Sequence, residues 1–351
     1  MFIHETEFMT EFIEIDGSQG EGGGQMIRTS VALSAITGKP IKITNIRAKR
    51  CNPGLRPQHL KGIEACASMC SAELTGGEIG SSEITFIPGK ISSGNHIIDT
   101  GTAGSVVLIL QTILLPALHA DAPVKLEIIG GTEGLWAPSI EYFNEVLAKF
   151  LEKMNIDINV EIVKHGFYPK GGGKVLVNIN PCKEIKPLNL TERGKFTRTD
   201  IRAGVSEGLR DKQVAERMIN GAKKIFEKFD CEHPVYLTTD CLGGYVHMHA
   251  HYENTILGST SIANKGIRAE DLGESCAKIL KEDMKSNACL DRYMADQILP
   301  FLALAGGSIS VAQISNHTKT NMHIIEKFLP VKFEVDEKNK IISVKKLKNN
   351  F

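Results

Sequence analysis

Apolar residues recur along residues 12–87 with helical and strand periods, and these periods predict six elements. A strand at 12–15 is followed by a glycine-rich loop, a helix over about 25–37 and a strand at 41–46. A second helix is expected from 57 to about 70, because Leu60, Ile63 and Ala67 share one helical face. Two alternating segments, 72–76 and 83–87, predict a strand pair. The predicted order is β-α-β-α-β-β.

The same order recurs after residue 95. We expect a strand at 96–101, a helix over about 103–119, a strand at 124–129, a helix over 138–154, and strands at 156–162 and 174–179. The first helices of these two units begin at residues 25 and 103, which gives a period of 78 residues. A third, partial copy is predicted near the end, with helices over 293–307 and 322–329 and strands at 308–314, 331–335 and 341–346. Internal repetition of this kind indicates one structural unit used several times.

The third copy begins 190 residues after the second, so 112 residues are left over after one period. The surplus, roughly 188–285, is read as a β-α-β-β-α module with helices near 211–229 and 269–285. We therefore predict an α+β fold in which three βαβαββ repeats form a large domain, residues 10–187 and 286–345. A small α/β domain, residues 188–285, is inserted into it. The first boundary stays open, since a strand at 185–190 could belong to either domain.

Composition narrows the function class. The 351 residues carry 41 basic and 41 acidic side chains, and this balance argues against a protein that coats polyanions, so any nucleic-acid site must be local. The acidic N-terminal segment does not resemble a signal peptide, and the longest apolar stretch, 106–118, is too short to cross a bilayer. The eight cysteines include no Cys-x-x-Cys pair. We expect a cytoplasmic protein with free thiols and no membrane span.

Two neighbouring segments favour a phosphate ligand. Glycines at 17–24 lie between a predicted strand and a predicted helix, where backbone amides can approach an anion, although a turn that needs positive φ explains them equally well. From 25 to 61 the chain has eight basic residues and no acidic one. Arg47, Lys49, Arg50 and Arg56 surround one loop of this stretch, and guanidinium groups suit bidentate phosphate contacts. A polyphosphate or a nucleic-acid end is the ligand class that we expect.

Several histidines are candidates for chemistry. His317 lies at the predicted start of a helix, whose positive potential keeps an imidazole neutral and nucleophilic, yet position alone fits a surface histidine better. His247, His249 and His251 alternate along a probable strand, an arrangement that could bind a metal, but without a neighbouring carboxylate pair exposed strand histidines are the better interpretation. His59, at a helix start, could contact phosphate.

With these pieces placed, the chain resembles the RNA 3′-terminal phosphate cyclase family over nearly its full length. The segments that carry the resemblance are 16–28, 46–60, 101–105, 165–175 (HGFYPKGGGKV), 293–300 and 315–321 (SNHTKTN). The resemblance implies ATP-dependent nucleotidyl transfer, in which His317 attacks the α-phosphorus of ATP and becomes a covalent AMP adduct. The adenylate then passes to an RNA 3′-phosphate, and the 2′-hydroxyl closes a 2′,3′-cyclic phosphate with release of AMP. The resemblance also implies a thioredoxin-like topology for the inserted domain.

Position by position, the resemblance assigns further roles around His317. Glu21 is expected to contact a Mg²⁺ or Mn²⁺ ion. Gln25 and Arg28 are expected to lie near the triphosphate, and Asp296 and Gln297 are expected to contact the nucleotide or orient the histidine. Tyr293 would stack on adenine opposite Pro138, and Arg47, Arg50 and Gln58 would bind RNA or ATP phosphates.

Two other functions compete with the cyclase. One is a relative that binds RNA in ribosome assembly without turnover, which the presence of His317 makes less favoured. The other is a carboxyvinyl transferase, whose enzymes share the repeated unit but use phosphoenolpyruvate, so adenylation of His317 would separate the two. The pattern leaves a homodimer open.

Overall fold

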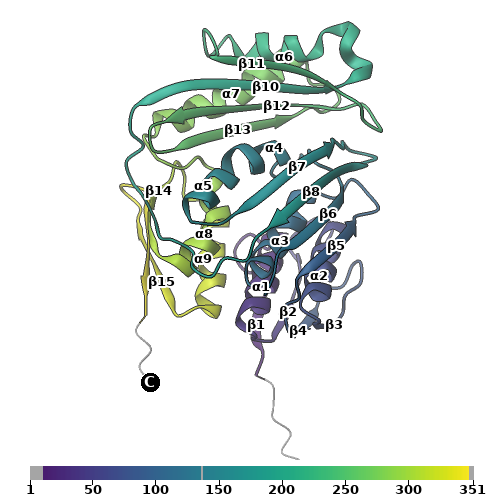
Figure 1. Cartoon of the computed structure of the whole chain (residues 1–351), viewed down its shortest axis with the longest axis vertical. Helices are drawn as coiled ribbons and strands as arrows, with labels where there is room; N and C mark the ends of the chain where they lie inside the picture. The colour runs from purple at the N-terminus through teal and green to yellow at the C-terminus, as the bar shows by residue number, and fades with distance from the viewer. Residues whose placement is uncertain (1–10, 136, 348–351) are drawn as a thin grey trace, which may run out of the picture.

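The computed structural model describes residues 11–135 and 137–347, and within them it is an α+β protein with four four-stranded sheets (Figure 1). The predicted domain start at residue 10 lies just outside the described residues. The four sheets fall into two groups with separate hydrophobic cores.

The first sheet contains β1 (Ile13–Asp16), β2 (Ile41–Thr44), β3 (Glu73–Thr75) and β4 (Ile84–Ile87) in the order β1-β2-β4-β3. Two helices, α1 (Gly24–Thr37) and α2 (Pro57–Met69), connect its strands. All six elements agree with the predicted order within a few residues. Helix α1 is capped by Gly38, whose backbone amide donates a hydrogen bond to the Ser34 carbonyl. The φ of Gly38 is 70°, a left-handed conformation that glycine adopts without steric cost.

The second sheet has the same chain order. It contains β5 (Gly94–Asp99), β6 (Val124–Gly130), β7 (Ile158–Lys164) and β8 (Gly173–Ile179), arranged β5-β6-β8-β7. Helix α3 (Val106–Leu118) joins β5 to β6. The second predicted helix is found as α4 (Ile140–Tyr142), a π-helical turn (Phe143–Leu147) and α5 (Ala148–Lys153).

The third sheet takes its first strand from before the insertion. It contains β9 (Leu188–Leu190), β14 (Gly307–Ser310), β15 (Val331–Asp336) and β16 (Ile341–Lys346), with α8 (Met294–Ala305) and α9 (Asn316–Phe328) between its strands. Strand β9 pairs in parallel with β14. Across the sheet the strands therefore lie in the same spatial order as before: first, second, fourth and third in the sequence. Leu188 and Leu190 bury their side chains in the first core, so the strand that the sequence left open between the two domains packs with the third sheet.

The fourth sheet forms the small domain at one end of the molecule (Figure 1). It contains β10 (Phe196–Ser206), β11 (Cys231–Leu237), β12 (Gly244–Tyr252) and β13 (Ile256–Ile262) in the order β11-β10-β12-β13. One face packs against α6 (Val214–Ala222) and α7 (Ala269–Lys285). The module has one strand more than predicted, and its strands β12 and β13 are joined by only three residues.

The other face of the small domain's sheet is turned toward the large body. Val246, Met248 and Ala250 of β12 point into the small core, so His247, His249 and His251 occupy the opposite face. Ring contacts confirm the direction, since His247 lies edge-on to Tyr142 of α4 with centroids 6.4 Å apart. The prediction that these histidines are exposed is wrong, because the large body covers this face and leaves His247 buried and the other two only partly accessible.

Candidate active site

A cavity of about 880 Å³ lies where the large body meets the small domain. The first turns of α1, α2, α8 and α9 all line it, and a helix N-terminus carries positive potential and unpaired amide donors. The small domain contributes β13 residues to the opposite wall. Residues used below that line the cavity are Gly24, Gln25, Arg28, Arg47, Arg50, Arg56, Gln58, His59, Gln111, Pro138, Thr260, Arg292, Tyr293, Asp296, Gln297 and His317. Converging helix N-termini make the cavity a site for anions.

The charged side chains that line the cavity also favour an anionic ligand. Five arginines line the cavity, and Asp296 is the one acidic residue among the lining residues. Arg292 is paired with Glu282 and Asp283, which lie outside the lining. Burial together with the nearby guanidinium groups of Arg56 and Arg50 lowers the pKa of Arg47. Arg47 is also held in place, because its Nη1 donates to the carbonyls of Asn52 and Gly54 at 2.6 and 3.0 Å. Such a group of mutually repelling cations is stabilised by a bound polyanion.

His317 is the second residue of α9, whose N-cap residue is Ser315. The Ser315 hydroxyl accepts from the Thr318 amide at 3.1 Å, and this capping box fixes the start of the helix. The His317 ring reaches back to the glycine loop, where its Nε2 lies 2.7 Å from Glu21 Oε2. Arg50 Nη2 lies 3.8 Å from the same carboxylate oxygen. The imidazole is thereby held at the edge of the arginine cluster.

The glycine loop is shaped to bring α1 close to the site. Gly20 and Gly22 have φ values of 55° and 56°, so the turn that the sequence suggested is present. A Cβ at Gly24 would overlap the ring of His59 in α2. His59 is 6% exposed, and burial and the neighbouring arginines lower its pKa to about 3. It therefore packs as a neutral ring and accepts from the Arg56 amide at 3.3 Å.

Side chains of α1 and α8 meet beneath the cavity. Gln25 Nε2 donates to Asp296 Oδ2 at 2.9 Å, and burial raises the pKa of Asp296 to about 6. Burial lowers the pKa of the half-buried Arg28 to about 10. The nearby carboxylate of Asp296 acts in the opposite direction, because it favours the charged guanidinium. Gln297 Oε1 accepts from Gln111 at 2.8 Å. These two bonds fix the side-chain amides of Gln25 and Gln297 in position before any ligand binds.

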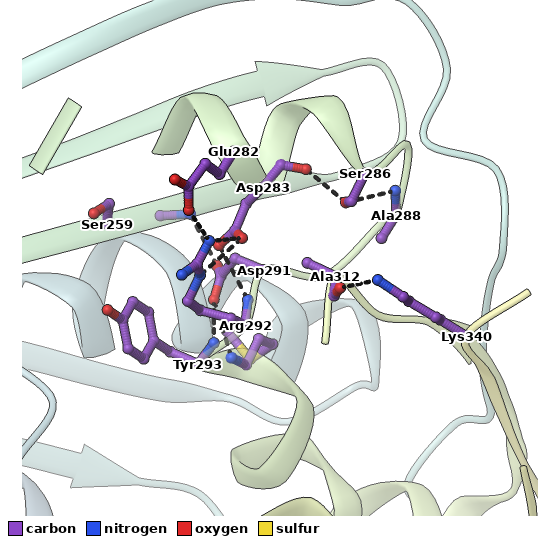
Figure 2. Close-up of polar contacts among 12 residues, drawn as sticks. Ser259, Glu282, Asp283, Ser286, Ala288, Asp291, Arg292, Tyr293, Ala312 and Lys340 are labelled. Atoms are coloured by element: carbon purple, nitrogen blue, oxygen red, sulfur yellow. Dashed lines mark hydrogen bonds and ion pairs between the residues drawn. The ribbon is translucent and has the colours of Figure 1, made fainter. Parts of the chain in front are cut away.

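Tyr293 is held at the cavity by the backbone around Asp291, at the junction of α7 and α8 (Figure 2). The fully buried Asp291 carboxylate accepts from the amides of Tyr293 at 2.9 Å and Gly258 at 2.9 Å, and from the Tyr142 hydroxyl at 2.8 Å. Arg292 Nε donates to Asp283 at the end of α7, at 2.9 Å. The aromatic ring of Tyr293 is 40% exposed and available to a planar ligand.

A second polar cluster lies between the second sheet and the small domain. His165 Nδ1 is 3.5 Å from Glu133 Oε1, and His165 Nε2 is 3.5 Å from Glu141 Oε1. The Tyr245 hydroxyl of β12 donates to Glu141, and its ring stacks on His165 with centroids 5.5 Å apart. Burial raises the pKa of Glu133 to about 7. His165 opens the HGFYPKGGG segment, so this segment joins the two domains.

Comparison with known proteins gives the family of this chain. A sequence model described as RNA 3′-terminal phosphate cyclase matches residues 19–335. The chain belongs to the RNA 3′-terminal phosphate cyclase family. A protein of that name from Thermococcus kodakarensis is 43% identical over 333 residues, which cover 93% of this chain and 95% of the relative. Another from Nitrosospira multiformis is 41% identical over 339 residues, covering 95% and 96%.

The structure gathers the residues expected from the family at one place. All of them except Glu21 line the cavity, and Glu21 reaches it through its contacts with His317 and Arg50. Asp296 and Gln297 bond to Gln25 and Gln111, and no hydrogen bond joins either to His317 among the described residues. Sequence reasoning missed Gln111, Arg292 and Thr260. The polar Gln111 within an apolar helix was a usable signal, whereas Thr260 belongs to the other domain and had none.

Proposed function

We propose that this enzyme cyclises the 3′-phosphate of an RNA through a covalent AMP adduct of His317, with ATP as the source of the adenylate. Family membership supports the cyclase activity itself. The observation that supports the mechanism is the position of His317. It lies at a helix N-terminus beside arginines that face only one carboxylate in the cavity lining.

The first step forms a bond from an imidazole nitrogen to the α-phosphorus of ATP and breaks the bond to pyrophosphate, which leaves. An oxygen of the RNA 3′-phosphate then attacks that phosphorus and releases the imidazole. The 2′-hydroxyl finally attacks the 3′-phosphorus, and AMP departs. In each step negative charge develops on phosphoryl oxygens, which Arg28, Arg47, Arg50 and the helix N-termini are placed to stabilise.

The contact between Glu21 and His317 belongs to this mechanism. The attacking nitrogen needs a free lone pair, so Nε2 becomes available only after Glu21 takes its proton or moves away from it. Glu21 is also the residue that we propose for Mg²⁺. One partly exposed carboxylate next to phosphate-binding arginines fits the usual magnesium site, in which substrate phosphates complete the coordination. The ion would offset charge on those phosphates.

Substrate binding follows from the remaining residues. The exposed ring of Tyr293 and Pro138 are proposed to hold the adenine, and Gln25, Asp296 and Gln297 the rest of the nucleotide. Gln58, Arg47 and Arg50 are proposed to bind the terminal phosphate of the RNA.

The fold is part of the same proposal. The three sheets of the large body share one chain order, which supports three copies of a βαβαββ unit. The order β11-β10-β12-β13 supports a thioredoxin-like topology for the inserted domain. For cellular location the structure adds one fact: among residues 11–135 and 137–347, each helix is too short or too polar to span a bilayer.

The direct test incubates the protein with ATP, Mg²⁺ and a short RNA that ends in a 3′-phosphate, and then treats the RNA with phosphatase. We expect the terminal phosphate to become resistant, because a cyclic diester offers no monoester to the phosphatase. An end that stays sensitive would favour a protein that binds RNA without turnover.

A further inference from the structure

The small domain holds a second group of potential ligands, separate from the cavity. Asp200 of β10 and His249 of β12 are directly paired across the antiparallel ladder, and His251 is two residues further along the same face of β12. Their ligand atoms all lie within 4.8 Å of one another. We propose that Asp200, His249 and His251 bind a zinc-type divalent transition-metal ion.

The distances suit a tetrahedral ion. Asp200 Oδ2 lies 3.3 Å from His249 Nε2 and 3.1 Å from His251 Nε2. Zinc binds imidazole nitrogen and carboxylate oxygen at about 2.0–2.2 Å, so two ligand atoms of a tetrahedral site are separated by roughly 3.3 Å. Two of the three separations therefore already have nearly the value that the ion requires, and the two imidazole ligand atoms lie within 4.8 Å of each other. Three protein ligands leave the fourth position open to water.

The protonation states also suit a metal. Burial lowers the pKa of His249 to about 4 and lowers that of His251, so both imidazoles are neutral near pH 7. The pKa of Asp200 is lowered despite its burial, because His249, Arg198 and His251 favour the carboxylate. Metal binding near neutral pH thus has little proton release to oppose it. Imidazole with a single carboxylate selects zinc or cobalt over magnesium, which prefers oxygen ligands.

The local hydrogen bonding is incomplete without a further partner. Asp200 is only 6% exposed, yet its Oδ1 has no hydrogen-bond partner among the described residues, so this oxygen can join Oδ2 in holding an ion. A buried carboxylate oxygen without a partner is unusual and points to an unseen ion or water. His251 has a side chain 26% exposed, which gives an ion a path from solvent.

Arg198 is the group that competes with the ion. Its Nε donates to Asp200 Oδ2 at 2.9 Å, and its Nη2 lies 3.4 Å from His251 Nε2. The Arg198 side chain is 53% exposed, so it can turn into solvent when a divalent ion takes its place. The bound ion would link β10 to β12 on the face that packs toward the large body.

The test measures zinc binding to the metal-free full-length protein by competition with a coloured chelator. We expect the original protein to bind one ion per chain. His249→Gln and Asp200→Asn should bind it with an affinity at least about tenfold weaker. His233→Gln, an exposed histidine of the same sheet, is the matched control and should bind as the original protein does. Arg198→Gln should bind more tightly, since it removes the competing cation without altering a ligand.

Cobalt separates this site from cysteine or active-site binding. We expect the visible spectrum of tetrahedral cobalt with nitrogen and oxygen ligands, retained in His317→Ala. The proposal is overturned if the original protein binds no zinc, if His249→Gln and Asp200→Asn bind it as well as His233→Gln does, or if the spectrum shows thiolate ligands.

Discussion

Replacing Glu133 by glutamine should remove a specific part of the pH dependence of folding stability. Glu133 is 2% exposed, and both of its carboxylate oxygens lack hydrogen-bond partners among the described residues. Burial raises its pKa from the ordinary 4.5 to about 7. Below pH 4.5 the residue is neutral in both the folded and the unfolded protein, so its ionisation has no effect there. As the pH rises to 7, only the unfolded chain gains the carboxylate, and the folded state loses stability.

The size of this loss follows from the shift. One pKa unit is worth about 1.4 kcal/mol, so the folded state should lose at most about 3 kcal/mol from Glu133 between pH 4.5 and 7. Glutamine has nearly the same shape and cannot ionise. The free energy of unfolding of Glu133→Gln, relative to the original protein, should therefore rise by up to that amount over the same interval.

The assay is urea unfolding, followed by tryptophan fluorescence or circular dichroism, at several pH values from 4.5 to 8. Glu161→Gln is the matched control, since Glu161 is exposed on the neighbouring strand β7 and its replacement should leave the pH profile unchanged. Burial also raises the pKa values of Asp291 and Asp296. Both groups contribute equally to the pH profiles of the original protein and of Glu133→Gln, so the difference between the two profiles isolates Glu133. Parallel profiles for Glu133→Gln and the original protein would refute the reasoning.

Three further variants test the cavity. Arg50→Ala removes a half-exposed guanidinium that we propose binds phosphate. KM for the phosphorylated RNA should rise about 10- to 100-fold, while the melting temperature stays unchanged. A normal KM would contradict the phosphate role. Tyr293→Ala should weaken ATP binding about tenfold or more, measured by calorimetry, while Tyr293→Phe keeps it; equal losses would exclude stacking. Gly24→Ala should lower both melting temperature and activity, because its Cβ overlaps His59; an unaffected variant would show that α1 and α2 can move apart.

The sequence predicted the local elements better than the way in which they assemble. Helices α1, α3 and α8 are rich in apolar residues and were found within a few residues of their predicted bounds, whereas α9 begins at Asn316, six residues before its predicted apolar pattern. The sequence left β9 open between the two domains, because three residues carry no information about a partner strand more than a hundred residues away. The prediction for His247 of β12 failed for the same reason, since Tyr142 of another part of the chain packs against its ring.

In the candidate site, too, local features could be predicted from the sequence and long-range contacts could not. The glycine loop, the basic stretch and His317 each had a mechanism visible in the sequence, and the structure brings them to one cavity. The contact of His317 with Glu21 joins residues almost 300 positions apart. Sequence periodicity describes short-range order only, and such a contact depends on how the sheets pack.

The central claim is that His317 carries the adenylate, and labelling tests it most directly. The protein is incubated with Mg²⁺ and ATP labelled at the α-phosphate, then denatured and examined for bound label. We expect label that is lost in acid and stable in alkali, absent from His317→Ala, and retained in His323→Ala, a control at an exposed histidine of the same helix. Label that persists in His317→Ala, or that never appears on the original protein, would contradict the account.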